Sequence, residues 1–102
     1  MATTESSTDR VEIGERVIAL RSEGKSLATI AKTIGVARSV DAFIALADAI
    51  ARRPKREQAK LRADETGRLD AIEERTRRKH EGDELDRKLA SIQKLRKRLA
   101  AG

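Results

Sequence analysis

Apolar residues recur at helical spacing in the first half of the chain, and the clearest run lies between Ser26 and Gly35. Its apolar positions are Leu27, Ile30, Ala31 and Ile34. Their i, i+3, i+4, i+7 spacing is typical of a short amphipathic helix. Ser26 stands where an N-cap hydroxyl accepts a bond from a free amide, and Gly35 stands where a left-handed residue ends a helix. The pattern therefore predicts a helix over 27–34.

A second apolar stripe begins shortly after this helix. Its members are Val40, Phe43, Ile44, Ala47, Ile50 and Ala51. The stripe predicts a helix over about 39–53, and Pro54 ends it because the residue before a proline is disfavoured in the helical region. Two helices joined by about four residues around a glycine are typical of a helix-turn-helix. The small residue Ala31 would let the two backbones pack closely at the corner.

A further helix is expected before this pair. Asp9 and Glu12 have the spacing of a capping box, which predicts a helix from about residue 10 to residue 23. Residues 1–8 are rich in serine and threonine, and we expect them to form a disordered N-terminus. Together with the two helices that follow, this helix would complete a trihelical helix-turn-helix domain over residues 9–53.

Residues 54–102 have the pattern of a charged helical oligomerisation segment. They predict a helix over 55–80, a break at Glu81-Gly82-Asp83 and a last helix over about 83–100. The last helix carries apolar residues at alternating steps of four and three, with Arg96 interrupting the seam. The residues assigned to oligomerisation are Leu85, Leu89, Ile92, Leu95 and Leu99. The pattern leaves open whether the two helices fold back as a hairpin or associate between chains as a coiled coil.

Composition supports an all-α fold. Charged residues make up 39% of the 102 residues, and the only aromatic residue is one phenylalanine, so leucine, isoleucine, valine and alanine must form the core. No stretch shows the alternation of a half-buried strand. The predicted fold class is all-α, with an N-terminal trihelical helix-turn-helix followed by two charged C-terminal helices.

The sequence also narrows the expected cellular location. No apolar run reaches the roughly 18 residues of a membrane span. The N-terminus lacks the basic-then-apolar layout of a secretion signal. We therefore expect a cytoplasmic, nucleoid-associated protein without a membrane partner.

The net charge of +6 is unevenly distributed. Residues 1–51 contain six Lys/Arg and seven Asp/Glu, a balance of −1, whereas residues 52–102 contain seventeen and ten, a balance of +7. The basic character therefore belongs to the C-terminal half. Its cations either neutralise the phosphates of a nucleic acid or form solvated helix faces balanced by neighbouring carboxylates, and the sequence leaves both interpretations open.

A helix-turn-helix suggests which residues would contact DNA, because its second helix enters the major groove and its first residues meet the base edges. The candidate DNA-binding residues are Lys25, Lys32, Arg38, Ser39, Asp41, Ala42, Arg52 and Arg53. Arg38 suits a guanine edge and Asp41 suits the amino group of cytosine. Ser39 suits a base or a phosphate, and the lysines and later arginines suit phosphates. These assignments predict double-stranded DNA as the partner.

No catalytic, cofactor or metal site is expected. The absence of cysteine excludes a disulfide framework and a thiol nucleophile. The segment E-G-K-S at 23–26 lacks the upstream glycine of a phosphate-binding loop. The single histidine, His80, has no second histidine or cysteine with which to form a metal site. We therefore expect a protein that is not an enzyme.

The segment that begins at residue 16 reads R-V-I-A-L-R-S-E-G-K-S-L-A-T-I-A-K-T-I-G-V-A-R-S-V. Over residues 16–53 the chain resembles the homeodomain-like helix-turn-helix of DNA resolvases and invertases, which is common in small actinobacterial and phage DNA-binding proteins. The resemblance implies that Arg38 and Ser39 begin a recognition helix. Two later segments are similar to actinophage proteins that include small terminase subunits. They are G-R-L-D-A-I at 67–72 and E-L-D-R-K-L-A-S-I-Q-K-L-R-K-R-L at 84–99.

Two functions from different classes follow from these patterns. The first is a DNA-binding homodimer, a transcriptional regulator or a phage or mobile-element factor, whose recognition helices lie about 34 Å apart on the duplex. The alternative is a protein-binding adaptor, in which the helix-turn-helix is a scaffold and the charged C-terminal helices engage a protein partner. The near-neutral charge of the first half is the observation that favours the adaptor.

Overall fold

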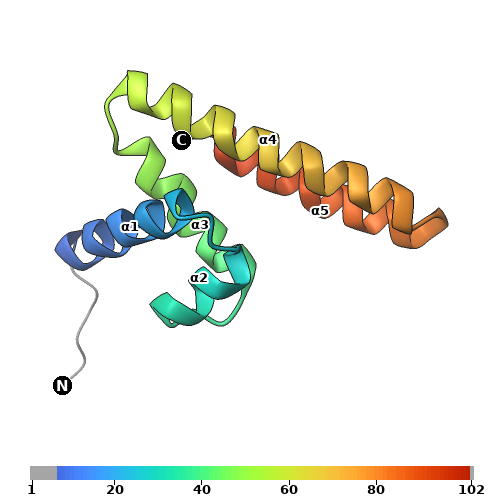
Figure 1. Cartoon of the computed structure of the whole chain (residues 1–102), viewed down its shortest axis with the longest axis horizontal. Coiled ribbons are helices and arrows are strands. Elements are labelled where there is room, and N and C mark those ends of the chain that lie inside the picture. Colours follow the sequence, from blue (N-terminus) through green and yellow to red (C-terminus); the bar gives the residue numbers. More distant parts are fainter. Residues whose placement is uncertain (1–6, 102) are drawn as a thin grey trace. The chain divides into compact units, whose positions relative to one another are not determined.

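A computed structural model describes residues 7–101, with side chains from Val11 to Ala101, and this part of the chain is helical apart from short connections (Figure 1). The helices are α1 (Ser7–Ser22), α2 (Leu27–Ile34), α3 (Ser39–Ala51), α4 (Lys55–Lys79) and α5 (Gly82–Ala101). Residues 7–101 contain no strand, which confirms the all-α fold class. The chain divides into two compact units, Met1–Arg53 and Pro54–Gly102.

The first helix begins earlier than the sequence predicts. Ser7 and Thr8 belong to α1, although the sequence placed them in a disordered terminus, and residues 1–6 lie outside the described residues. Asp9 therefore lies inside α1, and the capping box predicted between Asp9 and Glu12 does not mark the helix start. The error has a physical cause: serine, threonine and aspartate are all favoured at a helix start, so composition does not choose among neighbouring positions.

The connection between α2 and α3 is built from local hydrogen bonds. The Ser26 hydroxyl accepts a bond from the Thr29 amide at 3.2 Å, which confirms the predicted N-cap of α2. Gly35 adopts the left-handed conformation with φ of 80°. The amides of Gly35 and Val36 both donate to the carbonyl of Ala31 at 3.0 Å and so satisfy the end of the helix. Only four residues, 35–38, then separate α2 from α3.

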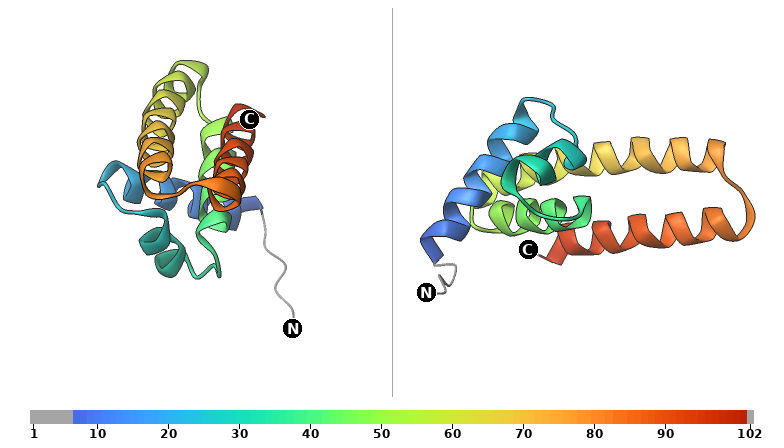
Figure 2. Two further views of the ribbon diagram at one scale, coloured as in Figure 1. Left: turned by 90° about the vertical axis from the view of Figure 1, so that its right-hand side faces the viewer. Right: turned by 90° about the horizontal axis from the view of Figure 1, so that it is seen from below.

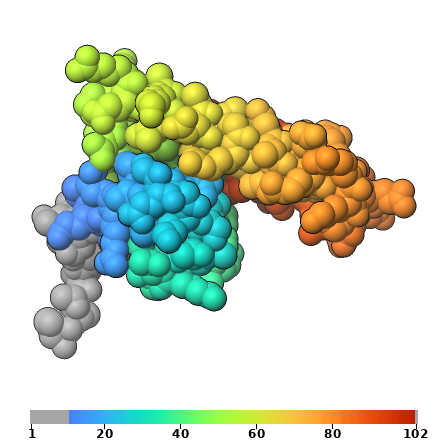
Figure 3. Space-filling model, viewed as in Figure 1, coloured from blue at the N-terminus to red at the C-terminus, as the bar shows by residue number. Residues whose placement is uncertain are grey.

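The core of the first unit is centred on α3, which contacts both α1 and α2. The buried apolar residues of this unit are Val17, Ile18, Ile30, Ala31, Ala42, Phe43, Leu46, Ala47, Ala49 and Ile50. The stripe predicted for α3 is wrong at its first position, because Val40 is 37% exposed. At 100° per residue, the buried residues of α3 span an arc from Ala49 to Ala47, and Val40 lies at its edge, about 20° beyond Ala47. In the space-filling view, the side chains of α1 and α2 form one continuous surface (Figure 3).

Helix α1 approaches α3 closely at a glycine. Gly14 is buried, and a Cβ atom added to it would lie 2.8 Å from the Cβ of Ala49 and 3.2 Å from a guanidinium nitrogen of Arg52. Real Cβ atoms do not approach so closely, so the two small residues set the spacing of the helices. This contact holds α1 against the last turns of α3.

The second unit is an antiparallel hairpin of α4 and α5 (Figures 1 and 2). The structure thus selects one of the two arrangements that the sequence left open. The stripe predicted to join separate chains, Leu85, Leu89, Ile92, Leu95 and Leu99, belongs to this intrachain hairpin. Ile92 and Leu99 are buried, as is Leu69 on α4. Leu85, Leu89 and Leu95 remain half-buried.

The seam position that Arg96 interrupts is held by ion pairs within the hairpin. Its guanidinium contacts Asp70 at 2.8 Å and Glu73 at 2.9 Å, both on α4. A charged residue is thereby tolerated in the stripe, because its charge is compensated across the hairpin.

None of the helices within residues 7–101 is long and apolar enough to cross a membrane.

Candidate nucleic-acid interface

The corner between α2 and α3 exposes the first residues of α3. Arg38 occupies the N-cap position in an extended conformation, with φ of −129° and ψ of 151°, and its side chain makes no capping bond. Its side chain is 71% exposed, and Ser39, the first residue of α3, is exposed as well. The N-terminal end of α3 therefore presents an arginine and a hydroxyl to any ligand that approaches it.

Arg38 is held in place by the first turn of its own helix. Its Nε donates to one carboxylate oxygen of Asp41 at 3.3 Å, and a terminal nitrogen donates to the other at 3.1 Å. These bonds lower the pKa of Asp41 and raise the pKa of Arg38. An arginine carries five N–H donors, so the pair leaves three for another ligand. Asp41, which the sequence assigned to cytosine, is instead engaged by Arg38.

Ala42 does not belong to this surface. Its exposed fraction is 0%, so the base contact predicted for it is wrong. The reason is the helical period: Ala42 lies one turn before Leu46 on the buried arc of α3. Lys25, in the turn before α2, and Lys32, in the last turn of α2, are both exposed. Lys32 is a cation close to the corner, whereas Lys25 lies at the opposite end of α2.

The two later arginines of the predicted set lie at the opposite end of α3. Arg52 follows Arg38 by fourteen positions, a distance of about 21 Å at the rise of an α-helix. Arg52 is exposed, but Arg53 donates a hydrogen bond to the carboxylate of Glu15 on α1. The structure therefore brings Arg38, Ser39 and Asp41 together and separates them from Arg52 and Arg53.

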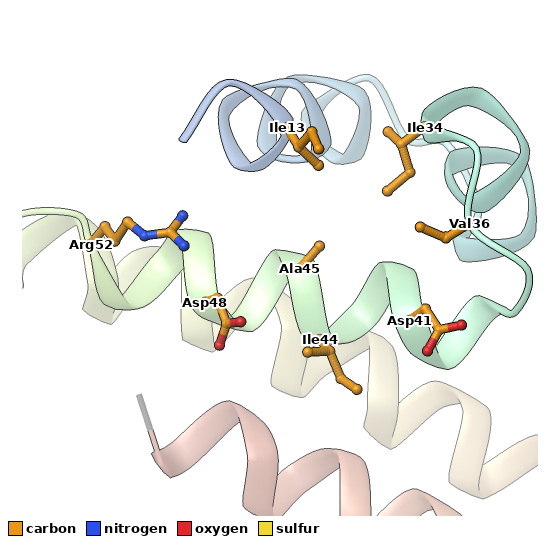
Figure 4. Close-up of a pocket in the computed structure, with 8 residues that line it drawn as sticks. All are labelled: Ile13, Ile34, Val36, Asp41, Ile44, Ala45, Asp48 and Arg52. Carbon is orange, nitrogen blue, oxygen red and sulfur yellow. The ribbon is translucent and has the colours of Figure 1, made fainter. Parts of the chain in front are cut away.

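An open hollow of about 280 Å³ lies between α3 and the two helices before it. Ile13 and Ile34 point toward α3, and Ala45 on α3 points toward them (Figure 4). The remaining lining residues are Val36, Asp41, Ile44, Asp48 and Arg52. The lining is mainly apolar, with two carboxylates and one guanidinium. A small apolar side chain of a partner would fit it better than a phosphate would.

Sequence reasoning missed Val40 as a surface residue. It is the second residue of α3, and the apolar spacing predicted it on the inward stripe. A signal was present in the sequence: Ala42, Leu46 and Ala49 form an i, i+4, i+7 set that competes with the chosen stripe. Adding that set to the predicted stripe would have shifted the centre of the buried arc toward Ala42 and moved Val40 to its edge.

The hairpin also has a hollow, but its arginines, Arg77 and Arg96, are paired with the carboxylates of Asp70 and Glu73. Among the side chains from Val11 to Ala101, no group of three His, Cys, Asp or Glu residues could hold a metal ion. His80 ends α4, and its Nδ1 lies 2.7 Å from a carboxylate oxygen of Glu84 on α5. This contact links the end of α4 to the first turn of α5.

Comparison of the chain with protein-family models, curated proteins and solved structures gives no match. The function proposed next therefore depends on the residues of the chain itself.

Proposed function

We propose that the protein binds double-stranded DNA through a helix-turn-helix formed by α2 and α3. The observation that carries the proposal is the short, glycine-capped corner that leaves Arg38 and Ser39 exposed at the start of α3. The first residues of a recognition helix are those that meet base edges in the major groove. The trihelical arrangement of α1 to α3 would supply the rigid support for that helix.

The charges around the corner support this proposal. Lys32 and Arg38 are exposed near the turn, Lys25 is exposed at the other end of α2, and Arg52 is exposed at the far end of α3. Cations at these positions would contact phosphates and orient the helix in the groove. Asp41 would act on Arg38 by holding its guanidinium at the N-terminus of α3, while the remaining N–H donors reach a guanine edge.

A salt titration tests the proposal. Fluorescence anisotropy of labelled random duplex DNA should show affinity that falls steeply with salt, with a log–log slope of roughly −3.6 if four cations each displace about one counterion. Absence of binding at low salt would refute DNA binding. Lys32→Ala should weaken every duplex alike and reduce the slope by about one.

A second variant separates base reading from phosphate contact. Arg38→Ala should weaken binding to a preferred sequence, selected from random duplexes, more than binding to random DNA. The exposed Arg16 on α1 provides a matched control, and Arg16→Ala should leave the preference unchanged. Equal losses on preferred and random DNA would remove Arg38 from the base-reading role.

A protein-binding adaptor is the second candidate, because the near-neutral charge of residues 1–51 and the hollow beside α3 both argue against a phosphate backbone at the helix-turn-helix. A mainly apolar depression with carboxylates in its lining is a poor surface for a phosphate backbone. In this alternative, the helix-turn-helix is a scaffold and the charged helices α4 and α5 engage a protein partner. The salt titration distinguishes the two candidates, because the adaptor would bind no duplex at low salt.

We also propose that two copies of the chain associate through their hairpins. Leu85, Leu89 and Leu95 are only half-buried within one hairpin, so pairing would remove more apolar surface from water. A dimer would present two recognition helices to half-sites about 34 Å apart. The corresponding biology is a transcriptional regulator or a phage or mobile-element factor, which would act in the cytoplasm at the nucleoid.

A further inference from the structure

We infer that Val40 contacts the C5-methyl group of thymine in the major groove and so determines part of the sequence preference. The inference rests on the proposed DNA binding and adds the class of base that α3 recognises. It starts from a feature that neither the core nor the ion pairs explain: a large apolar side chain exposed in the first turn of α3.

The exposure of Val40 is unusual for this chain. Among the side chains described, Val11 and Val40 are the exposed large apolar residues, at 44% and 37%. Val40 follows exposed Ser39 and precedes Asp41, which is engaged by Arg38. The buried arc of α3 starts only at Ala42. The side chain thus belongs to the same exposed end of the helix as Arg38 and Ser39.

The chemistry of the base edges selects the partner of this side chain. Each base pair presents hydrogen-bond donors and acceptors in the major groove, and thymine alone adds an apolar methyl group. Valine has neither a donor nor an acceptor. Against any other edge it would exclude water without replacing the lost hydrogen bonds, which is unfavourable. A thymine methyl is the group that its two methyls can cover without that cost.

The charges beside Val40 favour a nucleic acid over an apolar protein surface as the occupant. Arg38 lies two residues before it and is 71% exposed, and Lys32 is exposed on α2. Burying these cations against an apolar partner would be costly, whereas the phosphates of a duplex complement them. We therefore assign the position to duplex DNA.

Deoxyuridine provides a direct test, because it differs from thymidine only by the missing methyl group. The full-length protein is titrated with its preferred duplex, selected from a random pool, and with duplexes in which single thymines are replaced by deoxyuridine. At one or more positions the replacement should weaken binding about fourfold, the value expected for losing one methyl contact.

Variants assign the effect to the residue. In Val40→Ala, replacing thymine by deoxyuridine should weaken binding much less than it does in the wild type. In Val40→Thr, which retains one methyl, the loss of affinity should be intermediate. Val11→Ala, at the other exposed valine, should keep the full penalty. Circular dichroism checks that each variant retains its helices.

Three results would overturn the inference while leaving DNA binding intact: a preferred site without thymine, wild-type binding that is insensitive to deoxyuridine, or an unchanged penalty in Val40→Ala. A change in mass with Val40→Ala, measured by sedimentation, would show that a second copy covers the residue and would overturn it as well. Failure to bind any duplex would refute the proposed function itself.

Discussion

Single atoms decide the packing of the first unit, and Gly14 is the clearest case. Because Gly14 has no Cβ atom, α1 can approach Ala49 on α3. Gly67, in the middle of α4, is a glycine of the opposite kind, since a Cβ added there would meet nothing within 4 Å. The two glycines therefore form a matched pair for testing the close approach.

Gly14→Ala should destabilise the protein by about 1–2 kcal/mol, because overpacking outweighs the better helix propensity of alanine. Gly67→Ala should stabilise it by up to about 1 kcal/mol, because only propensity changes there. Urea denaturation followed by circular dichroism measures both changes. An unaltered free energy of unfolding in Gly14→Ala would show that α1 can move away from Ala49 at little cost.

The bonds between Arg38 and Asp41 give a second prediction at this scale. The pKa of Asp41, lowered by the hydrogen bonds from Arg38, should rise toward its ordinary value of 3.8 in Arg38→Ala. A carboxyl NMR titration measures the change. Because the folded pKa is depressed, the pair stabilises the fold above the ordinary pKa, and this stabilisation is lost as the pH falls through the folded value. Arg16→Ala should leave the titration of Asp41 unchanged.

Several residue-scale features of the first unit could be predicted from the sequence, and their locality explains why. The caps at Ser26 and Gly35 depend on hydrogen bonds between residues close in sequence, so local chemistry is sufficient. The orientation of α3 is different. Two apolar stripes compete in that helix, and the choice between Val40 and Ala42 depends on how α1 and α2 cover it. A local sequence pattern does not show which side of α3 the other helices will cover.

At the scale of elements, the hairpin depends on how it accommodates Arg96. Hydrogen bonds from Arg96 and Arg77 lower the pKa of Glu73 below its ordinary value. A depressed carboxylate stabilises the folded state above its ordinary pKa of 4.5, and the contribution is lost as the pH falls through the folded value. Part of the stability of the hairpin should therefore be sensitive to acid.

Arg96→Met should reduce this acid sensitivity. The methionine would continue the apolar seam but would remove the largest cause of the shift at Glu73. Denaturation at neutral pH and below pH 4.5 should show a smaller loss of stability on acidification than in the wild type. Lys97→Met, at the exposed neighbouring position, is the control. An identical acid response in wild type and Arg96→Met would rule out the proposed role of the pair.

The existence of all five helices could be predicted, but the pairing of the last two could not. The leucine stripe of α5 has the same spacing whether its partner is α4 of the same chain or a second chain. Arg96 carries the missing information, since its partners Asp70 and Glu73 both lie on α4. The sequence signal for the hairpin was an arginine within the apolar stripe of the last helix, together with acidic residues on the preceding helix that lie opposite it when the two helices are antiparallel.

At the scale of the molecule, the half-buried leucines predict association. Leu95 lies at the edge of the α5 stripe and is only half-buried. Sedimentation equilibrium should give the mass of a dimer, and Leu95→Glu should shift it toward the monomer while circular dichroism retains the helices. Lys94→Glu changes charge more strongly at an exposed position and should leave the dimer intact. A monomeric wild type at all concentrations would refute association.

The bond between Arg38 and Asp41 has a consequence for how such a protein could acquire new binding sites. Replacing Asp41 would delete one carboxylate and also set the arginine free to sample other orientations, so two elements of recognition would change in a single step. Replacing either residue alone should therefore change the sequence preference, because each replacement alters both members of the pair.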